Sequence, residues 1–163
     1  MAMTIPRPGD MAITRGGGLA MALVRFGTHS EYGHAAIVKE ATSIRVCVIE
    51  ATPHGVREKW YPLDHFKYST GGPIELTEVQ REIIVRTAQS YVGLPYDWPS
   101  IAAFVIRWLG AKHLSYSPSH PDKHLFCSEL VVWAYLIAKV FLFPGRAPGD
   151  VAPADLEQFC PNA

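Results

Sequence analysis

The sequence predicts a single domain that combines short β-strands in its first half with helices in its second half. Its 163 residues suit one domain with its own hydrophobic core. Strand-like runs separated by turn residues occupy the first sixty residues, whereas helical periodicity and capping residues begin near residue 77. The composition, 48% hydrophobic and 18% charged, is that of an ordinary globular protein. We therefore expect one domain over residues 1–163.

Four short runs in the first half have the character of strands. Residues 10–14 follow a Pro- and Gly-containing turn, and after three glycines residues 19–26 are apolar enough for a short buried helix. Two further runs, 34–39 and 45–50, flank a five-residue linker that suits a β-hairpin. Residues 55–60 add another extended piece, which Pro62 ends.

The second half contains the helical signals. Thr77 followed by Gln80 is a capping-box pattern, and it predicts a helix over residues 77–92. Pro99 opens a second helical run over 99–109, and a polar loop follows at 112–124. Residues 128–143 are apolar on nearly every side, which is typical of a helix at the centre of a domain. The tail is irregular, with one short helical turn expected at 154–159.

Cys127 stands where the polar loop meets this buried helix. The first turn of a helix has unpaired N–H groups and a positive dipole end, and both stabilise a thiolate. The same N–H groups can hydrogen-bond an oxyanion that forms when a thiolate attacks a carbonyl. The simpler interpretation is a small buried apolar side chain, as most free cysteines are. Position alone leaves the two interpretations level.

The predicted hairpin supplies a base and an orienting group for such a nucleophile. Pairing the strands about residue 42 places His34 opposite Glu50 and Ile37 opposite Cys47. A carboxylate beside an imidazole fixes its tautomer and stabilises its protonated form. Cys47 then lies on the other face and is a poor alternative nucleophile. Taken singly, His34 and Glu50 are also compatible with an ordinary surface pair.

A zinc site is the competing interpretation of the cysteine. His120, His124 and Cys127 form an H-x3-H-x2-C string. Two nearby prolines argue against a helix that presents both histidines on one face, and the three cysteines lack CxxC spacing. We therefore expect no metal and no other cofactor.

Several stretches together resemble the permuted, YiiX/YaeF-like branch of the NlpC/P60 superfamily of papain-like proteins. The stretches are GD at 9–10, GHAAIV at 33–38, VIEA at 48–51 with GV at 55–56, GLPYD at 93–97 and FCSELV at 126–131. In the unpermuted order the cysteine helix precedes the histidine strand, whereas here histidine comes first, as circular permutation would produce. The resemblance covers nearly the whole chain.

The resemblance implies an α+β fold in which a central antiparallel sheet, curled into a partial barrel, packs against the helix that carries the cysteine. It also implies catalytic roles: Cys127 as nucleophile, His34 as base and Glu50 as the third, polar member. The expected activity is a cysteine hydrolase, a peptidase or amidase acting on peptide or amide bonds, which are often derived from the cell wall. Two alternatives stay open: a lipid-directed acyltransferase or thioesterase of the lecithin:retinol acyltransferase-like type, with residues 101–109 lining an acyl pocket, and a binding module without turnover.

The charge balance limits the partners. Fifteen basic and fifteen acidic residues leave no basic patch for nucleic acid or for a membrane surface. The most apolar run, 130–143, is too short to span a bilayer and contains Lys139, and the N-terminus lacks the pattern of a signal peptide. We expect a cytoplasmic protein where it is made, with release by another route left open, and a small peptide, amide or acyl substrate. The sequence leaves the substrate-binding residues and the oligomeric state open.

Overall fold

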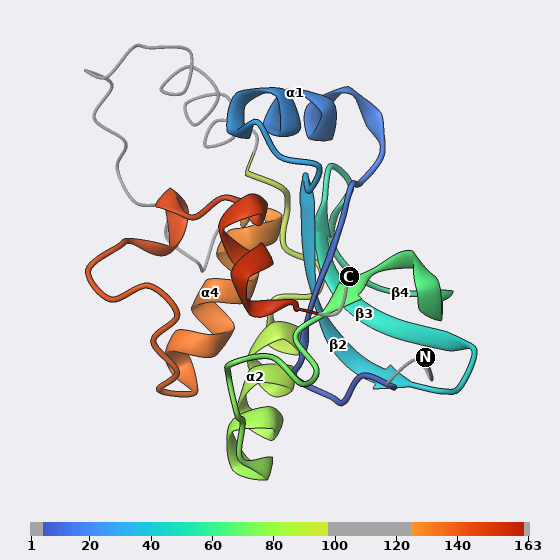
Figure 1. Ribbon diagram of the computed structural model, residues 1–163, viewed down its shortest axis with the longest axis vertical. Coiled ribbons are helices and arrows are strands. Elements are labelled where there is room, and N and C mark those ends of the chain that lie inside the picture. The colour runs from blue at the N-terminus through green and yellow to red at the C-terminus, as the bar shows by residue number, and fades with distance from the viewer. Residues whose placement is uncertain (1–4, 98–124, 162–163) are drawn as a thin grey trace.

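The computed structural model describes residues 5–97 and 125–161 and has a mixed α+β fold (Figure 1). Its centre is one five-stranded sheet in the order β4-β3-β2-β1-β5, and each neighbouring pair is antiparallel. The strands are β1 (Met11–Thr14), β2 (His34–Ala41), β3 (Arg45–Thr52), β4 (Gly55–Pro62) and β5 (Lys67–Tyr68). The first four were predicted, and the two-residue strand β5 was not.

The described helices are α1 (Gly18–Thr28), α2 (Glu78–Ser90) and α4 (Cys127–Ile137), with short 3-10 turns η1 (Leu63–His65), η2 (Pro148–Asp150) and η3 (Pro153–Phe159). The capping box before α2 is confirmed, because Thr77 and Gln80 exchange side-chain-to-backbone hydrogen bonds. The predicted helix over 99–109 and the loop at 112–124 lie outside the described residues. No helix in the described part of the chain has the length and apolar character needed to cross a bilayer.

The helix that carries the cysteine ends earlier than predicted. It was expected to reach residue 143, but α4 ends at Ile137. Lys139 has a φ of 61°, a left-handed conformation that no helix can continue through. The apolar residues beyond this point pack on the core from an irregular segment instead.

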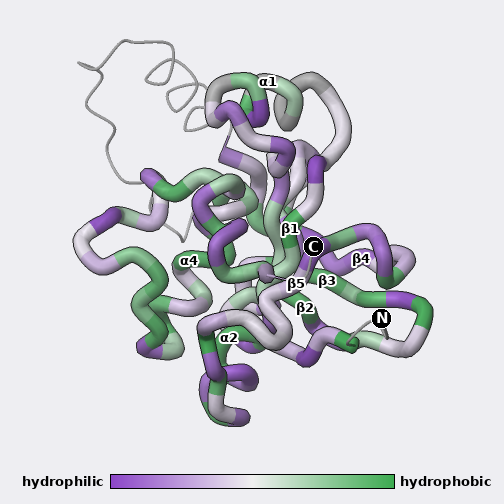
Figure 2. Tube along the Cα trace, viewed as in Figure 1, coloured by the Kyte–Doolittle hydropathy of each residue, from purple (hydrophilic) through white to green (hydrophobic). Residues whose placement is uncertain are grey.

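The sheet is buried on both faces by different parts of the chain. Helices α2 and α4 pack against each other and against one face, which carries Ile13, Ile37 and Ile49 (Figure 1). Hydrophobic residues predominate along α4, as Figure 2 shows. The other face carries alternating residues such as Ala36 and Val48, and the segment just after β4 covers it. This alternation explains why β2 and β3 read as almost continuously apolar.

The connection from β4 to β5 forces the sheet to curl. These strands form opposite edges of the sheet, yet only residues 63–66 separate them. Five steps of extended chain reach at most ~18 Å, and the 3-10 turn η1 shortens that reach. Four strand spacings of a flat sheet need ~19 Å. The two edges must therefore approach each other, although the sheet stays open.

The register of the β2–β3 hairpin differs from the predicted one. Glu50 pairs with Ala36 and not with His34. The turn is tighter than the expected five-residue linker. Only residues 42–44 separate the two strands, and the Thr42 hydroxyl hydrogen-bonds to both the N–H and the carbonyl of Arg45. Beside the turn the register differs by three residues from the predicted one, and a bulge between Val38 and Glu40 reduces this difference by one. At Glu50 the error is two residues, an even number, so His34 and Glu50 still share a face.

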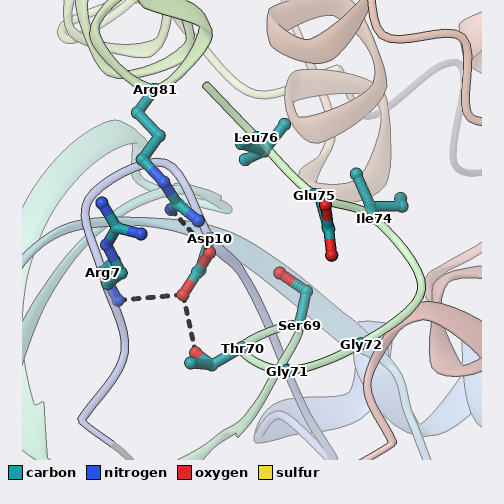
Figure 3. A pocket seen from close by; sticks show the side chains of 10 residues that line it. All are labelled: Arg7, Asp10, Ser69, Thr70, Gly71, Gly72, Ile74, Glu75, Leu76 and Arg81. Atoms are coloured by element: carbon teal, nitrogen blue, oxygen red, sulfur yellow. Dashed lines mark hydrogen bonds and ion pairs between the residues drawn. The ribbon is translucent and has the colours of Figure 1, made fainter. Parts of the chain in front are cut away.

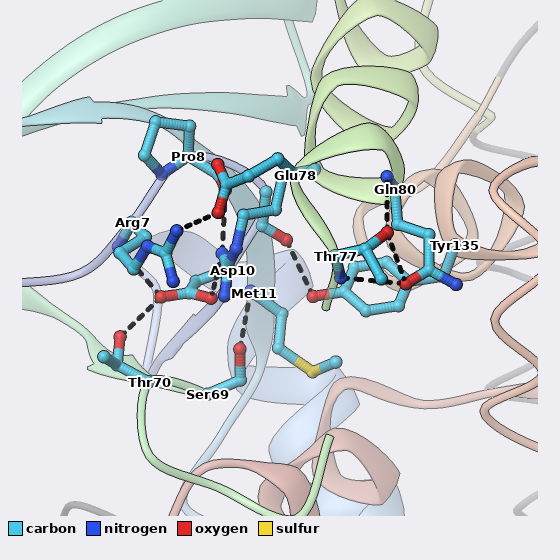
Figure 4. Close-up of polar contacts among 12 residues, drawn as sticks. Arg7, Pro8, Asp10, Met11, Ser69, Thr70, Thr77, Glu78, Gln80 and Tyr135 are labelled. Carbon is cyan, nitrogen blue, oxygen red and sulfur yellow. Dashed lines mark hydrogen bonds and ion pairs between the residues drawn. The ribbon is translucent and has the colours of Figure 1, made fainter. Parts of the chain in front are cut away.

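A buried ion pair joins the start of β1 to α2 (Figure 4). Asp10, 2% exposed, accepts hydrogen bonds from Arg81 Nη1 at 2.8 Å, the Thr70 hydroxyl at 2.6 Å and the Arg7 backbone N–H at 2.9 Å. Next to it, the Tyr135 hydroxyl donates to the Gly9 carbonyl at 2.8 Å. These bonds connect the N-terminal segment to both α2 and α4.

Replacing Arg81 by Gln is expected to lower the free energy of unfolding by about 3–5 kcal/mol, because it leaves the buried Asp10 carboxylate without its cation. Urea denaturation measures this loss. The matched control is Arg86→Gln on the same helix, whose ion pair with Glu82 is exposed and is expected to contribute at most about 0.5 kcal/mol. Equal losses for the two variants would contradict a structural role for the Asp10–Arg81 pair.

Candidate active site

Cys127 is the first residue of α4 and is 1% exposed. The turn before it is held by local bonds: the Phe126 N–H donates to the Glu129 carboxylate at 3.4 Å, and the Leu130 N–H donates to the Phe126 carbonyl at 3.0 Å. The Ser128 hydroxyl donates to the Val151 carbonyl at 2.6 Å and fixes the first turn to the tail. The thiol therefore projects from a rigid helix start whose first N–H groups have no partner within the helix.

His34 is the first residue of β2 and meets the start of α4. The thiol of Cys127 lies 4.0 Å from the carbonyl of Gly33, the residue before His34. His34 pairs with Thr14 of β1, and the Gly33 N–H donates to the Thr14 carbonyl at 3.2 Å. The structure thus brings together a strand start and a helix start that are 93 positions apart in the sequence.

Glu50 lies beside His34, as the sequence predicted, but diagonally across the hairpin. Its Oε2 atom is 2.7 Å from His34 Nε2, and its side chain is 2% exposed. Two residues that we did not predict hold the other oxygen: Arg57 Nε donates to Oε1 at 3.0 Å, and the Tyr61 hydroxyl donates to Oε1 at 2.8 Å. The carboxylate therefore has three donors.

Arg57 could have been found from the sequence. The turn between β3 and β4 has two residues, Pro53 and His54, and pairing about that turn places Arg57 directly opposite Glu50. Opposite charges at facing positions are the signal. Tyr61 lies four residues further along β4, opposite Val46, and its hydroxyl reaches the carboxylate along the strand direction.

The buried pair is ionised. Burial lowers the pKa of His34, but hydrogen bonding to Cys127 and Glu50 more than reverses this and raises it from 6.5 to about 9. Burial raises the pKa of Glu50, but the bonds from His34, Tyr61 and Arg57 lower it from 4.5 to about 2. Between these values His34 is an imidazolium and Glu50 a carboxylate.

The geometry leaves one nitrogen of the ring for the thiol. Nε2 is bonded to Glu50, which leaves Nδ1 as the ring nitrogen available to the thiol. A thiol, an imidazole and a carboxylate in this order are the parts that nucleophilic acyl transfer requires. All three predicted site residues are brought together.

Tyr96 adds a fourth polar group to this site. The segment around it runs beside the residues that precede α4, through a bridge between Tyr96 and Leu125. Burial, followed by the charges of Cys127 and Asp97, raises the pKa of the Tyr96 hydroxyl far above its usual range. The hydroxyl near Cys127 is thus a proton-bearing donor at any physiological pH. The sequence singled this stretch out only through the resemblance.

The other two cysteines lack these surroundings. Cys47 pairs with Glu40, and burial raises the pKa of its thiol. Burial also raises the pKa of Cys160, to about 12. Both thiols stay protonated at neutral pH. Of the competing zinc string, His120 and His124 lie outside the described residues.

A separate hollow of about 500 Å³ lies at the other end of β1 (Figure 3). Its lining residues are Arg7, Asp10, Ser69, Thr70, Gly71, Gly72, Ile74, Glu75, Leu76 and Arg81. It contains no cysteine or histidine, and Asp10, Thr70 and Arg81 in its wall bond to one another. We assign these groups to the stability of the fold.

Comparison with known proteins supports the fold. No family model matches the sequence, and no curated protein matches it. Among solved structures, the chain is similar to the crystal structure of the metalloprotein yiiX from Escherichia coli O157:H7. The TM-score is 0.54 and the identity is 28%, over 82% of this chain and 66% of that one. This chain thus spans slightly less than two thirds of the length of its structural neighbour.

The buried ion pair predicts how stability depends on pH. A raised His34 pKa contributes stability that is complete below pH 6.5 and is lost as the pH rises through about 9. A lowered Glu50 pKa contributes stability that is complete above pH 4.5 and is lost as the pH falls through about 2. The pair therefore stabilises the fold most between pH 4.5 and 6.5. Glu50→Gln is expected to cost on the order of 2–4 kcal/mol in this window and less on either side.

Urea unfolding of both proteins at about pH 3, 5.5 and 9.5 measures this difference. The matched control is Glu58→Gln in the next strand, which removes a more exposed pair with Lys39 and is expected to cost under about 1 kcal/mol. A Glu50→Gln cost that stays constant across the three pH values would contradict an ionised His34–Glu50 pair.

Proposed function

We propose that this chain is a cysteine hydrolase that cleaves a peptide or amide bond through Cys127, His34 and Glu50. One observation carries the proposal: a buried histidine is bonded to a buried carboxylate through one ring nitrogen, and a cysteine at a helix start lies against the residue that precedes this histidine. An ion pair that only stabilised the fold would not require a thiol next to its histidine. The similarity to YiiX and the order of histidine before cysteine fit the permuted papain-like arrangement, in one domain over residues 1–163.

The first half-reaction begins with attack by the Cys127 thiolate on the carbonyl carbon of the scissile bond. The carbonyl electrons move to oxygen, and a tetrahedral intermediate forms. The intermediate collapses when the His34 imidazolium gives its proton to the leaving nitrogen. An amine departs, and a thioester to Cys127 remains.

The second half-reaction returns the enzyme to its starting state. His34, now neutral, takes a proton from water while the water oxygen attacks the thioester carbonyl. The carboxylic acid product leaves, and Cys127 departs as a thiolate beside the regenerated imidazolium. Glu50 stays ionised throughout, because its function is to hold the ring and stabilise its positive charge.

Both half-reactions pass through a tetrahedral intermediate, and the oxyanion of each needs hydrogen-bond donors at the same position. The first N–H groups of α4 point outward from the helix start, and the Tyr96 hydroxyl is a proton-bearing donor near Cys127. We assign the oxyanion site to these groups. A helix start supplies them without rearrangement during the reaction.

The neighbouring structure is described as a metalloprotein, which raises the question of a metal here. Within residues 5–97 and 125–161, no three side chains of the His, Cys, Asp and Glu types are grouped as a metal site requires. Every step above uses only the chain's own side chains.

A reactive Cys127 that depends on His34 is the first expected outcome. Iodoacetamide at pH 7, followed by peptide mapping, is expected to label Cys127 well before Cys47 and Cys160, whose thiols stay protonated. His34→Ala is expected to slow the labelling of Cys127 about tenfold or more, because the thiolate loses its cation.

The matched control is His54→Ala, which changes an exposed histidine in the turn after β3. Labelling at Cys127 that is no faster than at Cys47, or that is the same in both histidine variants, would contradict the proposal and favour a binding module.

The substrate class is tested by incubation with peptidoglycan fragments and, separately, with phospholipid vesicles, followed by mass spectrometry. We expect a peptide or amide bond to be cleaved, with activity lost in Cys127→Ala and kept in Cys47→Ala. Acyl transfer from the phospholipid, without peptide cleavage, would instead indicate the lipid-directed acyltransferase or thioesterase.

A further inference from the structure

We propose that Arg57 and Tyr61 are positioning residues, which hold one oxygen of Glu50 so that the other stays on His34. The inference rests on the proposed function for its catalytic meaning. Neither residue needs to touch the substrate, because both act through Glu50 and then through His34. They lie on β4, the edge strand, and no motif in the sequence singled them out.

The first argument is that the two carboxylate oxygens of Glu50 bind different partners. Oε2 takes only the bond from His34, at 2.7 Å, while Oε1 takes the bonds from Arg57 at 3.0 Å and Tyr61 at 2.8 Å. A carboxylate held by a single partner can rotate about its last torsion, which is broad. Two donors on the far oxygen remove that freedom and fix the direction of the bond to His34.

The second argument is that Tyr61 is itself held in place. Its ring stacks on His65 at 4.6 Å between centroids, with an angle of 16° between the planes. Phe66 meets it edge-on at 5.2 Å, and Lys59 Nζ lies 4.7 Å from its centroid. A hydroxyl on a ring packed in this way donates to Glu50 without a large entropic cost. The Tyr61 ring is therefore fixed by contacts on several sides.

The third argument is the charge of a carboxylate that is 2% exposed. Burial alone would favour the neutral acid, and a neutral Glu50 would no longer stabilise the imidazolium. The titratable groups that interact with this carboxylate are His34 from β2, and Arg57 and Tyr61 from β4. Cys127 from α4 contributes to the raised pKa of His34. Arg57 and Tyr61 therefore keep Glu50 ionised even when His34 has given up its proton.

The test is the titration of the His34 ring, followed by NMR in the full chain, with alkylation of Cys127 by iodoacetamide as the second measurement. Tyr61→Phe, which removes no charge, is expected to lower the pKa of His34 by about half to one pH unit, because a loosened Glu50 stabilises the imidazolium less well. Arg57→Gln is expected to lower it by less, because it also removes a positive charge that opposes protonation of His34. Each variant is also expected to slow alkylation at neutral pH about three- to tenfold. Arg57→Lys, which keeps the charge but has a different donor geometry, is expected to recover part of the shift.

Two matched controls separate positioning from general loss of structure. Tyr68→Phe also removes a buried hydroxyl, but that hydroxyl donates to the Leu63 carbonyl and not to Glu50. Arg45→Gln removes an arginine that lies over Trp60, away from the carboxylate. Both controls are expected to leave the titration of His34 and the alkylation of Cys127 unchanged.

A His34 pKa that stays the same in both Tyr61→Phe and Arg57→Gln overturns the inference, and so does an equal shift in Tyr68→Phe. Because the NMR titration does not depend on turnover, it separates this inference from the proposed function. A shifted His34 together with an unreactive Cys127 in the wild-type chain supports the positioning of His34 and overturns the cysteine hydrolase.

Discussion

A carboxylate cannot stay ionised inside a protein unless several donors replace the water it has lost, and Glu50 meets this condition. His34, Arg57 and Tyr61 surround it from two neighbouring strands, and together they hold its pKa at about 2. The arrangement needs the curled sheet, the tight turn between β3 and β4, and the start of β2 in one place. The geometry of the candidate site therefore depends on this one buried charge.

The ion pair also determines the electrostatic surroundings of Cys127. An imidazolium at the start of β2 creates a positive environment next to the first turn of α4, whose own dipole has the same sign there. Under the proposed function, this imidazolium is the protonated base that acyl transfer needs beside its nucleophile. For Cys47 and Cys160, by contrast, burial raises the pKa of the thiol.

A second buried ion pair, away from the candidate site, stabilises the fold. Asp10 and Arg81 join the N-terminal segment to α2 near the opposite end of β1. A hydroxyl and a backbone N–H donate further hydrogen bonds to the Asp10 carboxylate. Because β1 lies next to β2 in the sheet, this anchor also fixes the strand that carries His34. The fold thus uses one charge pair to assemble its layers and another to form the candidate site.

The sequence by itself determined the local features. The apolar alternation and turn residues placed four strands, and the capping box placed α2, since these signals act over a few neighbouring residues. It also brought Cys127, His34 and Glu50 together as candidates. His34 and Glu50 lie on the same face of the hairpin although the predicted register was wrong, because the error at Glu50 was an even number of residues.

The tertiary structure decided what depends on distant contacts. The early end of α4, the bulge in β2 and the curl of the sheet follow from packing and turn geometry that no local pattern records. Tyr61 reaches Glu50 although the two residues do not face each other in the hairpin, so strand pairing alone does not predict the contact. The sequence could propose a nucleophile, a base and a carboxylate, but only three-dimensional packing could show what keeps that carboxylate charged.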